Sequence, residues 1–75
     1  MKQCMITFRS VTPAQRAESV LKKAGIVCGI HRTPKWMEEQ GCGYCIRLRT
    51  RDIMPAITLL RAKQVPFRRV YVMGE

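Results

Sequence analysis

The sequence predicts an α+β domain of the ferredoxin-like βαββαβ type, with a four-stranded antiparallel sheet and two helices on one of its faces. Two observations predict this class. Four segments alternate apolar and polar residues, as strands do, and two longer segments carry apolar residues at helical spacing. These segments follow the order strand, helix, strand, strand, helix, strand. Their expected ranges, in that order, are 3–9, 12–25, 26–31, 44–50, 52–65 and 67–73.

The first helix has the clearest start and end signals. Thr12 is a good N-cap, Pro13 suits the first helical position, and Gln15 stands three residues after the cap, as a capping box requires. Gly25 is expected to end the helix in the left-handed conformation. The apolar stripe consists of Ala17, Val20, Leu21 and Ala24. This stripe is the face that we expect to pack on the sheet.

The second helix is expected to begin at Asp52. With this cap Pro55 falls in the first turn, where a missing N–H group costs nothing. The helix is expected to end at Val65-Pro66. Its apolar stripe consists of Ile53, Ala56, Ile57 and Leu60.

Each strand has one apolar face, which we expect to lie under the helices. The residues expected on that face are Cys4, Ile6, Phe8, Ile26, Cys28, Ile30, Tyr44, Ile46, Leu48, Val70 and Val72. The opposite face of the sheet has no predicted cover, and is called the open face below. The residues expected on the open face are Arg9, His31, Cys45, Arg47, Arg49, Arg69 and Tyr71. A slip of one residue in any strand would exchange its two sets.

The segment between the second and third strands fits neither period. Residues 32–40 are therefore expected to form a loop, and long ordered loops often carry function. Two interpretations of its apolar residues stay open. Trp36 and Met37 would cover the sheet as a lid, or Trp36 would plug the edge of a small core.

Length and composition indicate one folded domain, residues 1–75. A chain of 75 residues can bury only about 60% of its unfolded surface, so its core must be compact. Hydrophobic residues make up 47% and charged residues 25%, which is typical of globular proteins rather than disordered ones. The sequence has neither an apolar run long enough to cross a membrane nor the apolar core of a signal peptide. We expect a cytoplasmic protein without a membrane partner.

The net charge of +9 favours an anionic partner. Nucleic acid is the commonest partner of this kind, followed by anionic small molecules and acidic proteins. The four cysteines of a cytoplasmic chain are expected to be reduced, catalytic or metal-bound rather than paired in a disulfide framework. Paired carboxylates, a phosphate-binding glycine loop and a hydrolase triad are all missing from the sequence, so no catalytic residues are predicted.

The motif Gly41-Cys42-Gly43-Tyr44-Cys45 is the strongest candidate site. Two glycines around Cys42 would let its thiol be exposed to a partner, although a glycine-rich turn with an incidental cysteine has the same pattern. Cations stabilise a thiolate, which is the nucleophilic form. The cations near the motif in the sequence are Arg32, Lys35, Arg47 and Arg49. Such a thiol could carry sulfur or selenium as a persulfide or selenyl-sulfide.

Two other thiol chemistries are weaker alternatives. In extended backbone Cys42 and Cys45 would lie roughly 10 Å apart, beyond the limit of about 7 Å between the Cα atoms of a disulfide. A redox pair therefore needs a turn at Gly43. Cys28 and His31 together with Cys42 and Cys45 would supply zinc ligands, but the first two point to opposite faces of one strand. Zinc is thus disfavoured, and no resident cofactor is expected.

RNA binding by the open face is the alternative from a different class of function. Tyr71 and Phe67 would stack on bases among the arginines of this face. The arginines would otherwise form an ordinary solvated surface. His31 has no nucleophile near it in the sequence and is expected to be a surface residue.

Six short segments spread along nearly the whole chain form a pattern: Thr7-Phe8-Arg9-Ser10, Arg16-Ala17-Glu18, Leu21-Lys22, Ala24-Gly25-Ile26, Thr33-Pro34 and Cys42-Gly43. This pattern resembles the putative selenium/sulfur carrier protein-like family of small bacterial proteins. The resemblance implies a carrier role through Cys42. Gly41 and Cys45 depart from the pattern expected of the family, and the chain is more basic. Cys45 would resolve a persulfide on Cys42, join it in a metal site, or be a neutral replacement.

The resulting hypothesis is a carrier without turnover of its own. Cys42 would accept sulfur or selenium from a donor enzyme such as a cysteine desulfurase and pass it to an acceptor protein. Gly41 and Gly43 would give access, the arginines at 47 and 49 would stabilise the anion, and Cys45 could assist release. An unpaired edge strand could also join two copies into a homodimer.

Overall fold

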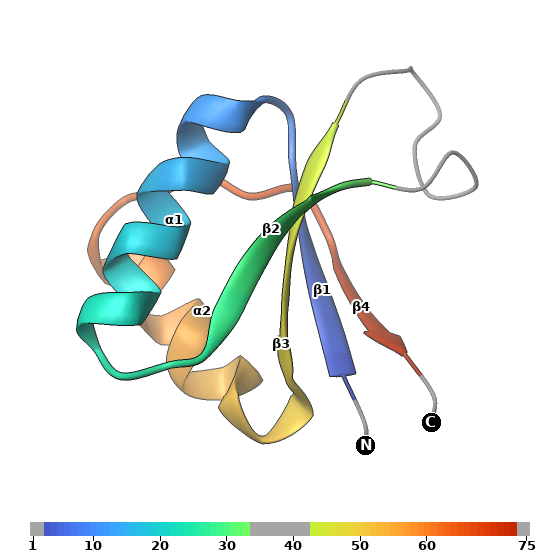
Figure 1. Cartoon of the computed structure of the whole chain (residues 1–75). Helices are drawn as coiled ribbons and strands as arrows, with labels where there is room; N and C mark the ends of the chain where they lie inside the picture. The colour runs from blue at the N-terminus through green and yellow to red at the C-terminus, as the bar shows by residue number, and fades with distance from the viewer. Residues whose placement is uncertain (1–2, 34–42, 74–75) are drawn as a thin grey trace.

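The computed structural model describes residues 3–33 and 43–73 and has an α+β fold, in which both helices lie on one face of an antiparallel sheet (Figure 1). The elements are β1 (Gln3–Phe8), α1 (Val11–Lys23), β2 (Cys28–Arg32), β3 (Tyr44–Arg49), the 3-10 turn η2 (Thr50–Asp52), α2 (Ile53–Ala62) and β4 (Val70–Met73). The helices of this described part are all too short or too polar to span a bilayer.

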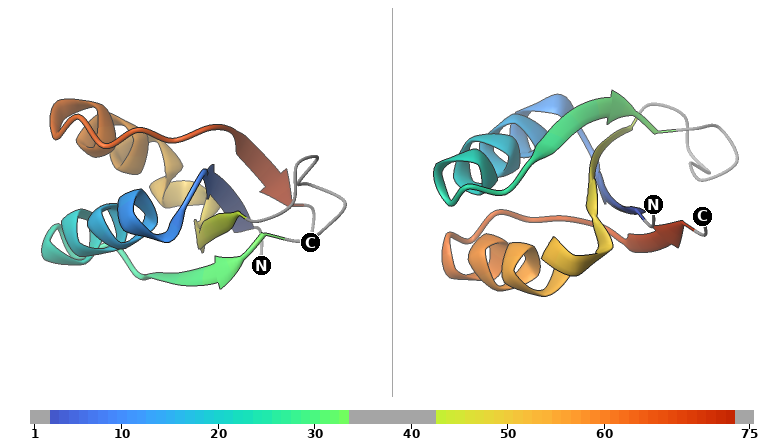
Figure 2. Two further views of the ribbon diagram at one scale, coloured as in Figure 1. Left: turned by 90° about the horizontal axis from the view of Figure 1, so that it is seen from above. Right: turned by 60° about the horizontal axis from the view of Figure 1, so that its bottom comes forward.

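The sheet has the strand order β2-β3-β1-β4, and all three pairings are antiparallel. The two central strands, β1 and β3, are therefore flanked by β2 and β4 at the edges. Figure 2 shows the two layers, with both helices on the same side of the twisted sheet. The predicted four-stranded antiparallel sheet and the two helices on one face are confirmed.

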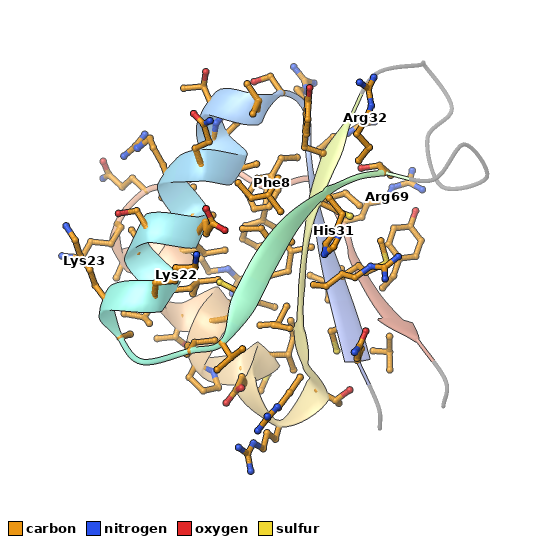
Figure 3. All side chains as sticks on the ribbon, in the orientation of Figure 1. Phe8, Lys22, Lys23, His31, Arg32 and Arg69 are labelled. Atoms are coloured by element: carbon orange, nitrogen blue, oxygen red, sulfur yellow. The ribbon has the colours of Figure 1, made fainter. Side chains whose placement is uncertain are left out.

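The main core fills the space between the helices and the sheet. Its largest fully buried members are Phe8, Ile6, Ile46, Leu21 and Leu60. Burial of one such side chain stabilises the fold by roughly 1.5–3 kcal/mol. Figure 3 shows Phe8 between α1 and the sheet. The packing confirms the predicted inner faces of β1, β2 and β3 and of Val70 in β4. Val72 was also expected on this face, but its side chain is exposed, because the helices do not extend over the end of β4.

The first helix begins earlier than predicted. Ser10, in extended backbone, is the N-cap, and the helix starts at Val11, so the capping box at Thr12 is wrong. Pro13 then lies at the third helical position, which has no intrahelical acceptor for an N–H group in any case. Pro13 is therefore compatible with both the predicted and the observed helix start, which differ by two residues.

Both helices end in the same hydrogen-bonding pattern. In α1 the N–H groups of Gly25 and Ile26 donate to the carbonyls of Lys22 and Leu21, each at 3.0 Å, and Gly25 has a φ of 82°. This pattern is a Schellman motif and confirms the predicted role of Gly25. In α2 the equivalent left-handed residue is Gln64, with a φ of 57°.

The second helix ends earlier than predicted, and two of the strands begin later. Asp52 is the N-cap of α2, as expected, but its side chain makes no capping hydrogen bond, and the helix ends at Ala62. The second strand begins at Cys28 rather than at residue 26, and β4 begins at Val70 rather than at residue 67. Both of these later strand starts follow a helix C-terminus.

Thr7 joins the start of β4 to the centre of the sheet. Its N–H donates to the carbonyl of Arg69 at 2.8 Å, and its carbonyl accepts from the N–H of Arg68 at 2.7 Å. Its hydroxyl also accepts from the N–H of Arg69 at 3.0 Å. These bonds satisfy the buried hydroxyl and extend the β1–β4 pairing two residues beyond β4 itself.

Candidate functional site

The predicted carrier cysteine, Cys42, lies outside the described residues, as does Gly41. The same holds for four other residues that the sequence analysis discussed, Pro34, Lys35, Trp36 and Met37. The structure does describe the residues at both ends of this segment, Thr33 and Gly43.

Thr33 and Gly43 are joined by the backbone. The N–H of Thr33 donates to the carbonyl of Gly43 at 3.1 Å, and Gly43 is buried. The bond continues the β2–β3 pairing by one step beyond Arg32 and Tyr44, which lie opposite each other. The residue that follows Cys42 is therefore held against the end of β2.

Cys45 lies on the open face, as predicted, but it is fully buried. It lies opposite Thr7 of β1 and His31 of β2. Cys45 and Met5 form a small second buried cluster on this face, and Tyr71 packs against it. The open face therefore has an apolar centre, although the alternation of β3 predicted a polar one.

Burial is the main influence on the Cys45 thiol, and it raises the pKa above the usual range of a thiol. Two smaller effects lower the pKa: the positive charge of Arg47 and the neighbouring hydroxyl of Thr33. The effect of Thr33 is weak, because the buried Oγ1 of Thr33 makes no hydrogen bond of standard geometry within the described part of the chain. Cys45 is therefore a protonated thiol at neutral pH.

Arg47 and Arg49 extend away from the cysteine motif along the open face. Both side chains are exposed, and they lie opposite Met5 and Gln3 of β1. Residues on one strand face repeat about every 7 Å. Arg47 is thus one repeat from Cys45, whereas Arg49 lies roughly 20 Å from Gly43, at the other end of β3.

The remaining residues predicted for the open face are divided between two places. His31 and Arg69 lie on the side of the sheet away from the helices (Figure 3), and Tyr71 packs on the buried cluster. Arg9 instead follows β1 and lines a hollow with Ser10 and the end of the α2–β4 connection. Its predicted place on the open face is wrong, because the strand ends at Phe8.

The cysteines and histidine of the described residues are not gathered into one site. Cys28 packs against the core under the helices, whereas His31 lies on the open face with Cys45. Within residues 3–33 and 43–73, groups of three or more His, Cys, Asp or Glu side chains that could hold a metal are not found. Cys4, Cys28 and Cys45 are free thiols.

Sequence reasoning missed two neighbours of Cys45. Thr33 was noted only within the Thr33-Pro34 pair, and Met5 was not among the residues singled out on the open face. The register places Met5 one repeat from Thr7 on that face. Met5 is an unbranched apolar residue on the open face of β1, next to the strand that carries Cys45. This combination is the signal that could have indicated a second cluster.

Comparison with known proteins gives one family. A search among curated proteins finds no match. A family described as "Putative Se/S carrier protein-like" matches residues 3–72, which include β1, the Thr33-Pro34 and Cys42-Gly43 pairs, and most of β4. Because the match covers nearly the whole sequence, the chain belongs to the Putative Se/S carrier protein-like family.

Proposed function

We propose that this chain carries sulfur or selenium on Cys42 as a persulfide or a selenyl-sulfide. Membership of the family is the observation that carries the proposal, since the matched residues include the Cys42-Gly43 pair. The anchored position of Gly43 supports it, because a thiol next to a fixed backbone residue can be offered to a partner from a defined place.

The loading step is an exchange between two cysteines. The Cys42 thiolate attacks the outer sulfur or selenium of a persulfide or selenyl-sulfide on the donor enzyme. A bond forms between Cys42 Sγ and the transferred atom, and the bond between that atom and the donor cysteine breaks. The donor cysteine leaves as a thiolate, so the reaction needs no added oxidant or reductant.

Arg47 is the supporting cation that lies nearer to the motif along β3. Arg49 is one repeat farther away, and its contribution at Cys42 is correspondingly smaller. Cys45, as a buried thiol of raised pKa, is a poor nucleophile at neutral pH. Release by attack of Cys45 would therefore need its thiol to be uncovered first.

The arrangement of the domain supports the same proposal. We infer that the sheet order β2-β3-β1-β4, with two helices on one face, is the ferredoxin-like split βαβ arrangement. In this arrangement the strand ends that flank the carrier segment, Arg32 of β2 and Tyr44 of β3, lie side by side at one end of the sheet (Figure 1). A donor enzyme and an acceptor protein could then reach Cys42 in turn.

Intact mass under non-reducing conditions tests the proposal. The chain is incubated with a cysteine desulfurase and either cysteine or selenocysteine. The expected result is an adduct of one sulfur or one selenium atom, removed by dithiothreitol and located on Cys42 by peptide mapping. The variant Cys42→Ser should form no adduct.

Two further cysteine variants are the matched controls. Cys28→Ser removes a half-buried thiol and Cys45→Ala removes the fully buried one, and each should still form the adduct on Cys42. An unmodified wild type, or an adduct that persists in Cys42→Ser, would disprove the carrier role of Cys42.

A further inference from the structure

A hollow of about 410 Å³ opens on the sheet where three strands meet. Its polar lining comes from Gln3 of β1, His31 of β2, and Arg47 and Arg49 of β3. These residues are far apart in the sequence, and the strand pairing brings them together. Gln3 lies opposite Arg49, and Gly29 of β2 lies opposite Arg47.

Gly29 is one of the residues that line the hollow. A glycine inside a strand leaves the space that a side chain would fill and lets a ligand approach the backbone. A Cβ atom added at Gly29 would lie 3.6 Å from Nε2 of His31. The imidazole of His31 therefore extends back over Gly29, on the side of the sheet away from the helices (Figure 3).

The charge of the hollow is uncompensated within the described residues. The described acidic residues, Glu18 and Asp52, belong to α1 and η2 rather than to the open face, and Glu18 is paired with Lys22 at 3.3 Å. The lining thus presents two guanidinium groups, an imidazole and a carboxamide to solvent. All four groups can donate hydrogen bonds.

This set of donors matches a tetrahedral dianion better than a carboxylate. A guanidinium binds two oxygens of an oxyanion at once, and two of them on one strand face are spaced about 7 Å apart. A phosphate monoester offers three strong acceptor oxygens and a charge near −2. A carboxylate offers two oxygens and a single charge.

We propose that this hollow is a binding site for a phosphate group. The ligand is a nucleotide-sized phosphate monoester, or the terminal phosphate monoester of a nucleic acid strand. The site does not depend on the carrier role, because its residues line the part of β3 that runs away from Gly43. It gives a role to the two exposed arginines on β3 and to the strand glycine that lies opposite Arg47.

Titration of the ¹⁵N-labelled full chain tests the site. Inorganic phosphate, adenosine monophosphate, a short single-stranded RNA with a 5′-phosphate and acetate are added separately at constant ionic strength, and backbone amide shifts are followed by NMR. Saturable shifts at Gly29, His31 and Arg47 are expected with the three phosphate ligands. Acetate should bind at least about tenfold more weakly, because it makes fewer charged hydrogen bonds.

A charge-matched pair of double variants separates the site from general attraction. Arg47→Gln with Arg49→Gln should weaken phosphate binding by at least about tenfold. Arg16→Gln with Arg61→Gln removes the same charge from exposed positions on the helices and should leave the affinity unchanged. The amide spectrum of each variant shows whether it has kept its fold.

Each outcome decides the proposal. If adenosine monophosphate binds more tightly than RNA, the ligand is a small phosphate ester, and the reverse identifies a nucleic acid strand. Equal losses in the two double variants, acetate binding as tight as phosphate binding, or shifts without saturation would overturn the site. The variant Cys42→Ser should bind phosphate normally, so this test and the carrier test can fail separately.

Discussion

Cys45 stands three residues after Cys42, yet its surroundings differ from those of an exposed thiol. It is fully buried against Met5, and burial raises its pKa while Arg47 acts in the opposite direction. The thiolate of Cys45 therefore forms only above the pH at which an exposed thiol ionises. Its reactivity should follow that shift.

Alkylation of the native chain by iodoacetamide should be slow at Cys45 at neutral pH and should accelerate only above the usual thiol range. In urea, where the burial is lost, the same residue should react at the rate of an ordinary cysteine. Arg47→Gln should raise the pKa further and slow the reaction, whereas Arg51→Gln, on η2, should not. Peptide mass spectrometry at a series of pH values measures these rates. Equal rates in the native and unfolded chain at neutral pH would contradict the burial of this thiol.

At the scale of elements, the two helices end alike but with different residues. Gly25 ends α1 and Gln64 ends α2, both with positive φ. The left-handed conformation costs a non-glycine residue about 1–2 kcal/mol. A glycine avoids this cost, but its larger conformational entropy in the unfolded chain offsets part of the advantage. The C-terminus of α2 therefore stores strain that α1 avoids.

Gln64→Gly should raise the free energy of unfolding by about 0.5–1 kcal/mol, because it relieves this strain at an exposed position. Gly25→Ala is the reverse change and should lower the free energy by about 1 kcal/mol. No described atom lies within 4 Å of a Cβ placed at Gly25, so only the backbone conformation is tested there. Urea unfolding followed by circular dichroism gives both values. A loss of stability in Gln64→Gly would mean that the glutamine side chain stabilises this turn.

At the scale of the whole molecule, the net charge of +9 opposes folding. The ion pair found in the described residues, between Lys22 and Glu18, is partly exposed and contributes little. Folding brings the many cations of this basic chain close together. Salt should screen this repulsion.

Raising sodium chloride from about 10 mM to about 0.3 M should increase the free energy of unfolding by on the order of 1 kcal/mol. Urea is the suitable denaturant, because guanidinium chloride is itself a salt. The variant with Arg16→Gln and Arg61→Gln, whose net charge is two units lower, should show a smaller dependence. If stability fell as salt rose, attractive pairs would outweigh the repulsion.

The secondary structure was largely predictable, because the apolar periodicity that identifies each element is also what packs it. The alternation at Tyr44–Arg49 predicted both the strand and its inner face. The helix ends were less predictable. Both Ser10 and Thr12 can cap a helix, and a proline is tolerated throughout the first turn, so local chemistry did not choose between them.

The hollow could not be predicted in the same way, because it depends on register across strands. Gly29 and Arg47 are eighteen positions apart and meet only through the pairing of β2 with β3. The sequence predicts His31 to be a surface residue and gives it no functional neighbours, because its neighbours in space come from other strands. The burial of Cys45 likewise depends on Met5 and on Tyr71, which alternation along β3 does not reveal.

The hydrogen bond from Thr33 to Gly43 has a consequence for protein engineering. The two residues that flank positions 34–42 are bonded to each other, so a change in the number of residues between them need not move either strand. The entropy of closing such a segment grows only slowly with its length. Other peptides could therefore be grafted between these two residues, with the remaining domain as a small display scaffold.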